Sequence, residues 1–170
     1  RTYELPSVWE GVPVTRIHDR AFAECREITK IILPQTITEI GRSAFIDCSN
    51  LKEIELPSTV RSIGACAFQS CTSLQKIAIP QNKELRIISN RLFSACPALQ
   101  AVYLPDTIAR IEANAFESVQ ADQLTIFYGG SQEQWAAVTI DPSAHVQFKK
   151  VTPHYNATPD NLKKFVCTAD

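Results

Sequence analysis

A regular repetition of phenylalanine constrains this chain more than any other feature of its sequence. The recurring residues are Phe22, Phe45, Phe68, Phe93 and Phe116, with steps of 23, 23, 25 and 23 residues. Isoleucine, proline and cysteine repeat in the same register, except that Val119 takes the place of a fifth cysteine. A sequence period in the twenties is typical of solenoid proteins, in which each repeat forms one coil of a stack. The shared period therefore predicts a solenoid with five main coils.

Each repeat contains three segments, which residues 51–71 illustrate. Apolar residues alternate at the end of 51–56, which indicates a strand, and Pro57 ends it because proline cannot donate to a ladder. Residues 60–63 form a short apolar leg, and residues 67–71 form a turn or short helix that points phenylalanine inward. Stacked coils bury these faces together. We expect an α/β solenoid with a parallel β-sheet on one face and short turns or 3-10/α helices on the others.

The repeat pattern ends near residue 128, so we assign residues 1–128 to the solenoid and 129–170 to a C-terminal cap of the same domain. Ser131–Gln134 has the pattern of a capping box that opens a short helix. Thr158 and Pro159 are typical of a second helix start. We expect this segment to cover the last coil's edge, and Trp9, in an insertion near the N-terminus, to cover the first.

Four of the six cysteines share the repeat register, which favours a buried column of reduced thiols. These residues are Cys25, Cys48, Cys71 and Cys96. Neighbouring coils lie close enough for disulfides, but parallel side chains make bridges unfavourable. The state of Cys66 and Cys167, outside the register, stays open. Paired ligands at short spacing are absent, so we expect no metal site.

Composition and motifs argue against several classes of function. A net charge of −1 gives no electrostatic footprint for nucleic acid, and no apolar run is long enough to insert in a membrane. The three histidines, His18, His145 and His154, have no catalytic partner at a motif spacing. We therefore expect no enzyme and no cofactor. The first residues resemble the end of an earlier repeat, so we expect any targeting segment to lie outside this chain.

The repeat unit L-x-x-I-x-L-P-x-x-V-x-x-I-G-x-x-A-F-x-x-C resembles the BspA-like leucine-rich repeat family. The matching residues in one unit are Leu51, Ile54, Leu56, Pro57, Val60, Ile63, Gly64, Ala67, Phe68 and Cys71. Residues 127–135 also resemble the family's usual aromatic-Gly-x-x-x-x-Trp ending, and the likeness covers roughly residues 3–138. It implies a right-handed leucine-rich-repeat solenoid from a cell-surface or secreted bacterial protein. Some members are implicated in adhesion to host proteins.

The outward positions of the strand face are the candidate ligand-binding residues. They are Lys30, Ile32, Glu53, Glu55, Lys76, Ala78, Ala101, Tyr103, Gln123 and Thr125. Tyr103, between small residues, is a candidate contact anchor. The alternating charges are better explained as an exposed ionic ladder, and a singly exposed Tyr or Ile is also ordinary on a protein surface. A competing site is a groove in the cap lined by Trp135, His154 and Tyr155.

Two functions remain open from the sequence. The first is a non-enzymatic module that binds a protein or glycan of unknown identity. The second is a structural spacer or stalk segment of a longer surface protein, whose faces bind nothing. The sequence does not indicate an oligomeric state, and a fold of this kind does not by itself fix a function.

Overall fold

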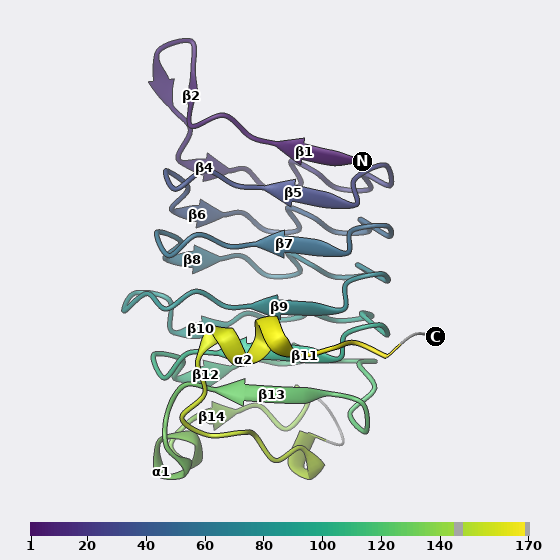
Figure 1. The fold of residues 1–170 in the computed structure, drawn as a ribbon, viewed down its shortest axis with the longest axis vertical. Helices are drawn as coiled ribbons and strands as arrows, with labels where there is room; N and C mark the ends of the chain where they lie inside the picture. Colours follow the sequence, from purple (N-terminus) through teal and green to yellow (C-terminus); the bar gives the residue numbers. More distant parts are fainter. Residues whose placement is uncertain (145–147, 169–170) are drawn as a thin grey trace.

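The computed structural model describes residues 1–144 and 148–168, and it confirms the predicted solenoid (Figure 1). Parallel coils are stacked along one axis, and each contributes one strand to a front sheet and one to a back sheet. The front strands are β1 (Thr2–Glu4), β5 (Lys30–Ile32), β7 (Glu53–Glu55), β9 (Lys76–Ala78), β11 (Ala101–Leu104) and β13 (Thr125–Tyr128). These strands lie in the segments where apolar residues alternate with period two, as predicted.

The short apolar legs on the opposite side form a second parallel sheet of two-residue strands. These are β4 (Arg16–Ile17), β6 (Glu39–Ile40), β8 (Ser62–Ile63), β10 (Ile87–Ile88), β12 (Arg110–Ile111) and β14 (Thr139–Ile140). In each of the first five, one residue points outward and the following isoleucine is buried. The repeating isoleucine therefore marks the inner position of the back sheet.

Both sheets are interrupted at the same level of the stack. The front ladder consists of β1-β5-β7 and, separately, β9-β11-β13. The back ladder likewise divides into β4-β6-β8 and β10-β12-β14. The coils on either side of this level lie visibly further apart than their neighbours (Figure 1). The turns remain joined there, because the N–H of Phe68 donates to the carbonyl of Leu92 at 3.1 Å.

The turns that carry phenylalanine are held by backbone conformations that are rare for residues with side chains. Two non-glycine residues per turn have positive φ; in one coil these are Cys66 (61°) and Ser70 (59°). The N–H groups of these residues point toward the next coil, and Ser70 donates to the carbonyl of Ser94 at 2.9 Å. The left-handed region costs about 1–2 kcal/mol per residue with a Cβ. The ladder between turns offsets this cost.

A column of phenylalanine rings fills the centre of the stack, as predicted. Phe22, Phe45 and Phe68 are stacked with centroids 5.4 Å apart, and Phe93 follows at 6.0 Å, across the interrupted level. Phe116 continues the column at 5.4 Å with a tilted ring. The rings from Phe45 onward are fully buried. Such continuous burial is what holds one coil on the next.

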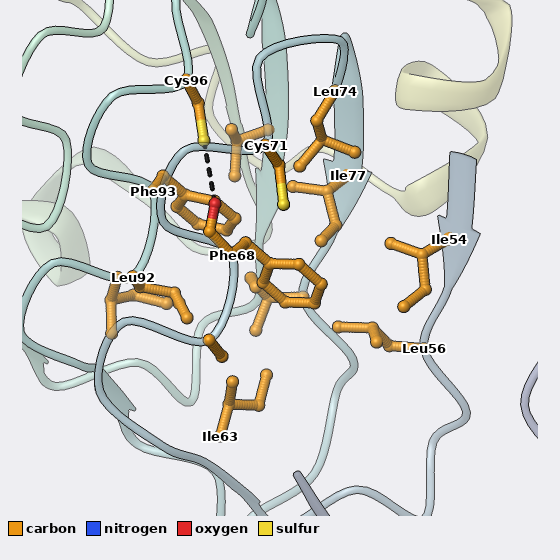
Figure 2. Close-up of a cluster of buried hydrophobic side chains, with 14 of the residues drawn as sticks. Ile54, Leu56, Ile63, Phe68, Cys71, Leu74, Ile77, Leu92, Phe93 and Cys96 are labelled. Carbon is orange, nitrogen blue, oxygen red and sulfur yellow. Dashed lines mark hydrogen bonds between the residues drawn. The ribbon is translucent and has the colours of Figure 1, made fainter. Parts of the chain in front are cut away.

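The cysteine column runs beside the phenylalanines, and its thiols serve as donors. Cys48, Cys71 and Cys96 are free and buried, which agrees with the prediction; Cys25 is only half-buried. The Cys96 thiol donates to the carbonyl oxygen of Phe68 at 3.1 Å, as Figure 2 shows. Cys48 and Cys71 make the same bond to the preceding coil. A thiol therefore fills a small apolar space and also satisfies a carbonyl.

The C-terminal segment continues the stack beyond the fifth repeat. A capping box at Ser131 opens helix α1 (Gln132–Ala136), and β14 then pairs with β12 in the back sheet. The 3-10 helix η1 (Phe148–Lys150) places Phe148 at 5.2 Å from Phe116, so it extends the phenylalanine column. His154 then forms a parallel bridge with Phe127 at the front. The repeat spacing did not reveal this sixth, irregular coil.

At the N-terminus the insertion forms a hairpin of β2 (Val8–Trp9) and β3 (Val12–Pro13). The hairpin projects away from the first coil (Figure 1). Trp9 is 66% exposed, so the expectation that it covers the first coil's edge is wrong. The short hairpin turns the indole outward.

Candidate functional site

The front face of the solenoid is divided into an open half and a covered half. Helix α2 (Pro159–Lys164) lies across β9 and β11, opposite in direction to the strands (Figure 1). Its start is fixed by the predicted signals: Pro159 is the first helical residue, and the N–H of Thr158 donates to Asn161 Oδ1 at 2.8 Å. The strands β1, β5 and β7 remain uncovered.

Lys76 binds the last turn of α2. Its Nζ donates to the carbonyl oxygens of Leu162 (3.2 Å), Lys163 (3.2 Å) and Phe165 (3.1 Å). The last carbonyls of a helix lack partners within the helix, and a cation there is also favoured by the helix dipole. Lys76 therefore caps α2 from the sheet beneath it.

Apolar contacts and one amide complete the attachment of this tail. Leu162 (5% exposed) packs in a cluster with Ala101 and Tyr103, and Phe165 lies at its edge. Beyond the helix, the side-chain amide of Gln100 accepts from the N–H of Thr168 at 2.9 Å and donates to its carbonyl at 3.1 Å. The tail is therefore bound along its length by outward residues of the solenoid.

The expectation that Tyr103 is an exposed contact anchor is wrong. Tyr103 is 2% exposed and Ala101 is fully buried, both beneath the tail. Burial raises the pKa of the Tyr103 phenol, and the nearby Asp106 carboxylate raises it further. Both residues point outward from β11 as the register predicts, but the tail occupies the space above them. The hypothesis of a binding site centred on Tyr103 therefore fails.

Most of the other candidate residues lie where the repeat register places them. Lys30, Ile32, Glu53 and Glu55 are exposed on the open half. Lys76 and Ala78 are half-buried at the margin of the tail.

Strand β13 departs from the predicted register by two residues. Thr125 pairs with Ala101, and Phe127 pairs with Tyr103. Thr125 therefore lies in the column assigned to Gln123, which is exposed but precedes the strand. The physical reason is the longer connection between Val119 and Leu124, which places Ile126 opposite Val102.

The charges of the open half form in part the ladder expected from the sequence. Lys30 Nζ lies 3.1 Å from Glu53 Oε2, and both side chains are well exposed. A pair of this kind stabilises by about 0–1 kcal/mol. Glu55 has no ion-pair partner within residues 1–144 and 148–168. The open half therefore carries a free carboxylate close to Ile32, which is 40% exposed.

A groove of about 640 Å³ lies beside α2, over the interruption between β7 and β9. One wall is formed by Pro159, Leu162 and Lys163 of the tail. Beside this interruption Ile54 and Leu56 keep a small exposure of 8% each, and both line the groove. Its remaining lining residues are Lys30, Gln35, Glu53, Ile54, Glu55, Leu56, Pro57, Ser58, Lys76, Ile77, Ala78, Ile79, Pro80 and Gln81. Apart from the insertion within residues 81–84, no sequence feature indicates this groove.

The competing site in the cap is not formed as expected. Trp135 packs edge-on against Tyr128, with ring centroids 5.0 Å apart, and His154 stacks on Phe127 at 5.3 Å. His154 lines a separate cavity of about 410 Å³ that includes neither Trp135 nor Tyr155. The three residues therefore do not share one groove.

The described part of the chain offers little for other kinds of chemistry. Residues 1–144 and 148–168 contain no group of three or more His, Cys, Asp or Glu that could hold a metal ion. None of their helices has the length and apolar character needed to cross a membrane. His145 lies outside the described residues. The groove can therefore offer contacts and charges to a ligand, and the strands supply a stable floor.

Comparison with known proteins matches the repeats to one family. The family model described as "BspA type Leucine rich repeat region" matches residues 12–129 in six copies. No curated protein matches the chain.

Solved structures of bacterial leucine-rich repeat proteins are similar to the chain. A leucine rich cell surface protein from Faecalibacterium prausnitzii is 30% identical with a TM-score of 0.73, over 82% of this chain and 35% of that one. The Leucine Rich Repeat protein of T. pallidum is 27% identical with a TM-score of 0.68, over 96% and 80%. The pneumococcal vaccine antigen PcpA (19%, TM-score 0.70, over 96% and 38%) shares the fold. This chain thus spans about a third of the length of the first of these proteins.

Proposed function

Because the chain belongs to the BspA type leucine-rich repeat family, we propose that it is a non-enzymatic binding module of a bacterial cell-surface or secreted protein. Its ligand in this proposal is a protein or glycan met in host adhesion. The name of the similar Faecalibacterium prausnitzii protein, a leucine rich cell surface protein, supports the location. The comparisons indicate no enzymatic family.

The proposed binding surface is the open half of the front face together with the groove beside α2. The observation that carries this proposal is the interruption between β7 and β9, where the groove of about 640 Å³ reaches apolar side chains. Ligand pockets are commonly about 300–1,000 Å³, with apolar walls and a few polar groups. The surrounding coils are packed through the buried phenylalanine column, so ordering this surface for a ligand costs little entropy.

Binding can be tested by capture from panels of host extracellular proteins and glycans. The variant Ser58→Trp places an indole in the groove without removing a core side chain, since Ser58 is exposed and lines the groove. The control Lys52→Trp adds the same ring at an exposed position that does not line the groove. We expect saturable capture by the native chain and by Lys52→Trp, with loss in Ser58→Trp. Equal capture by the two variants would contradict the proposed site.

A structural spacer is the second candidate, and the lengths of the relatives favour it. This chain covers 35% of the Faecalibacterium prausnitzii protein, so the part of that protein that resembles it belongs to a longer molecule. In a spacer the coils serve only to separate other parts. Absence of saturable binding to any protein or glycan in the panel, by a chain that is folded, would favour this candidate over the binding module.

A further inference from the structure

Helix α2 shows what kind of element the front face can hold. It is a six-residue helix that presents Leu162 to the sheet and has Lys163 and Lys164 in its last turn. Its C-terminal carbonyls accept from Lys76, the first residue of β9. The surface that holds this short helix thus consists of apolar residues beneath it and a lysine at the start of a strand.

The open half repeats this lysine. Lys30 is the first residue of β5 and pairs with Glu53 of β7. Lys76 holds the equivalent position in the next repeat, 23 residues after Glu53. Lys30 therefore lies two strands from Lys76 in the same outward column. Strands are about 4.8 Å apart, and one of these two steps is the wider, interrupted one, so the two lysines stand roughly 10 Å or slightly more apart. A helix with its side chains is about 10–12 Å wide.

The groove supplies apolar groups beside the matching position, between β7 and β9. It lies directly beside α2, and it is lined by Leu56, Ile77 and Ala78 as well as by Leu162 of the tail. Ile32 is exposed on the far side of β7. An apolar side chain from a second helix would enter between these groups, as Leu162 does over β11.

The charges of the open half specify the rest of the partner. Helix α2 covers Ala101 and Tyr103 of β11. Two strands away, on β7, the equivalent positions are Glu53 and Glu55. Both are exposed carboxylates. A helix seated there needs basic side chains, and α2 itself carries two lysines directly after its apolar residue. The surface ion pair between Lys30 and Glu53 is weak enough to rearrange.

We infer that the groove receives a short helix of a partner protein, which runs parallel to α2, places an apolar residue between β7 and the tail, and is capped by Lys30. Its last turn carries Lys or Arg toward Glu53 and Glu55. This inference rests on the proposed function, because it names the class of ligand for the same surface. Helix-in-groove binding of this kind reads apolar anchors and flanking charge.

The probe is the chain's own helix supplied as a separate peptide. A capped peptide of residues 157–168, with serine in place of Cys167 to prevent disulfides, is titrated into the isotope-labelled full chain and followed by NMR. We expect shift changes at Lys30, Ile32, Glu53 and Glu55. Because one surface contact of this size binds weakly, a second form carries the peptide fused through a Gly/Ser linker to Arg1, whose amino group lies 2.8 Å from Thr29 Oγ1, next to Lys30.

Matched variants decide whether the proposed contacts are made. Lys30→Ala removes the cap and Glu55→Lys reverses the free carboxylate; each should weaken peptide binding by about tenfold, the loss of one charge-assisted contact. Glu84→Lys makes the same charge change at an exposed position that does not line the groove and should leave binding unchanged. A peptide with Glu at both lysine positions should bind the native chain at least as weakly as the unchanged peptide binds Lys30→Ala.

Three results would overturn the inference. They are no shift changes even in the fused form, binding that Lys30→Ala leaves unchanged, and shifts at Lys76 and Tyr103 that indicate displacement of α2 instead of occupation of the groove. The proposed function fails separately. If a host protein or glycan is captured in a manner sensitive to Ser58→Trp while the peptide does not bind, the groove is a binding site but its ligand is not a helix.

Discussion

The ammonium group of Lys76 lies 3.1 Å from the carbonyl oxygen of Phe165, although the two residues are 89 positions apart in the sequence. One residue belongs to the repeat and the other to the tail outside it. Their contact is one of those that hold the tail over β9 and β11, and the other half of the front face is left open. The accessible surface of this solenoid is therefore set as much by its tail as by its repeats.

Replacing Lys76 with Met should loosen the tail without unfolding the coils. Met keeps the length of the side chain but removes three hydrogen bonds to helix carbonyls, each about 0.5–1.5 kcal/mol or more when charged. Amide exchange of Leu162 and Phe165 should become at least tenfold faster. Exchange in β5 and β7 should not change, and a uniform rise in exchange throughout the chain would contradict this prediction.

Removing one central ring should destabilise the whole stack. Phe68→Ala deletes a fully buried ring between two others, and core substitutions of this kind cost about 3–5 kcal/mol. The control is Phe22→Ala, which should cost less because Phe22 is half-buried and has one stacked neighbour. Urea unfolding measures both; equal losses would show that position in the column does not matter.

The cysteine column should make stability fall at alkaline pH. Burial raises the pKa of the Cys48 thiol to about 11 and that of Cys96 to about 12, and it also raises the pKa of Cys71. An unfolded thiol has a pKa of about 8.5, so below that pH both states are protonated and the stabilisation is complete. As pH rises toward 11, only the unfolded state loses protons. The free energy of unfolding should fall by about 1.4 kcal/mol per pH unit for each thiol.

The test of this pH effect is urea unfolding between pH 8 and 10, where the native thiols stay protonated. Over this range Cys71→Ala should reduce the slope by about 1 kcal/mol per pH unit on average, approaching 1.4 kcal/mol per pH unit near pH 10, because the unfolded thiol is only partly ionised near its pKa of about 8.5. Identical slopes in the two proteins would contradict it. In the native state at pH 8, alkylation should modify Cys66, Cys167 or Cys25 before any of the three buried thiols.

Glycine at a left-handed turn position should stabilise the chain. Arg91 has φ of 55° and an exposed side chain. Arg91→Gly removes a cost of about 1–2 kcal/mol, partly offset by glycine's greater unfolded entropy of about 0.5–1 kcal/mol. Thermal unfolding should show a gain relative to Arg91→Ala, which removes the same charge and keeps the Cβ. A lower melting temperature for glycine than for alanine would refute the argument.

The sequence predicts well whatever is repeated. The inward positions, the phenylalanine and cysteine columns and the outward placement of Lys30 and Glu53 all follow from one period, because each coil packs only on its neighbours. The wrong register at Thr125 has the same origin. The connection before β13 is irregular, so it is compatible with two registers that the repeat period does not distinguish.

The position of the tail could not be predicted in this way. The caps at Ser131 and Thr158 depend on local residues, so the sequence predicts both of them. The docking of Leu162 over Tyr103 depends on contacts between segments far apart, and no periodicity relates them. Likewise Phe148 enters the phenylalanine column from a segment that lacks the repeat, so only the structure reveals it.

The backbone hydrogen bonds between the turns that carry phenylalanine run in one sense, from an N–H of one coil to a carbonyl of the next, as between Phe45 and Ala67 or Phe93 and Ala115. At these turns each coil therefore has a donor side and an acceptor side, and the same backbone pattern recurs from one junction to the next. Whole repeats can be gained or lost in evolution without remaking any junction, whereas a coil inserted in reverse would meet donors with donors. The number of coils in such an array can therefore vary, whereas the orientation of each coil relative to its neighbours cannot.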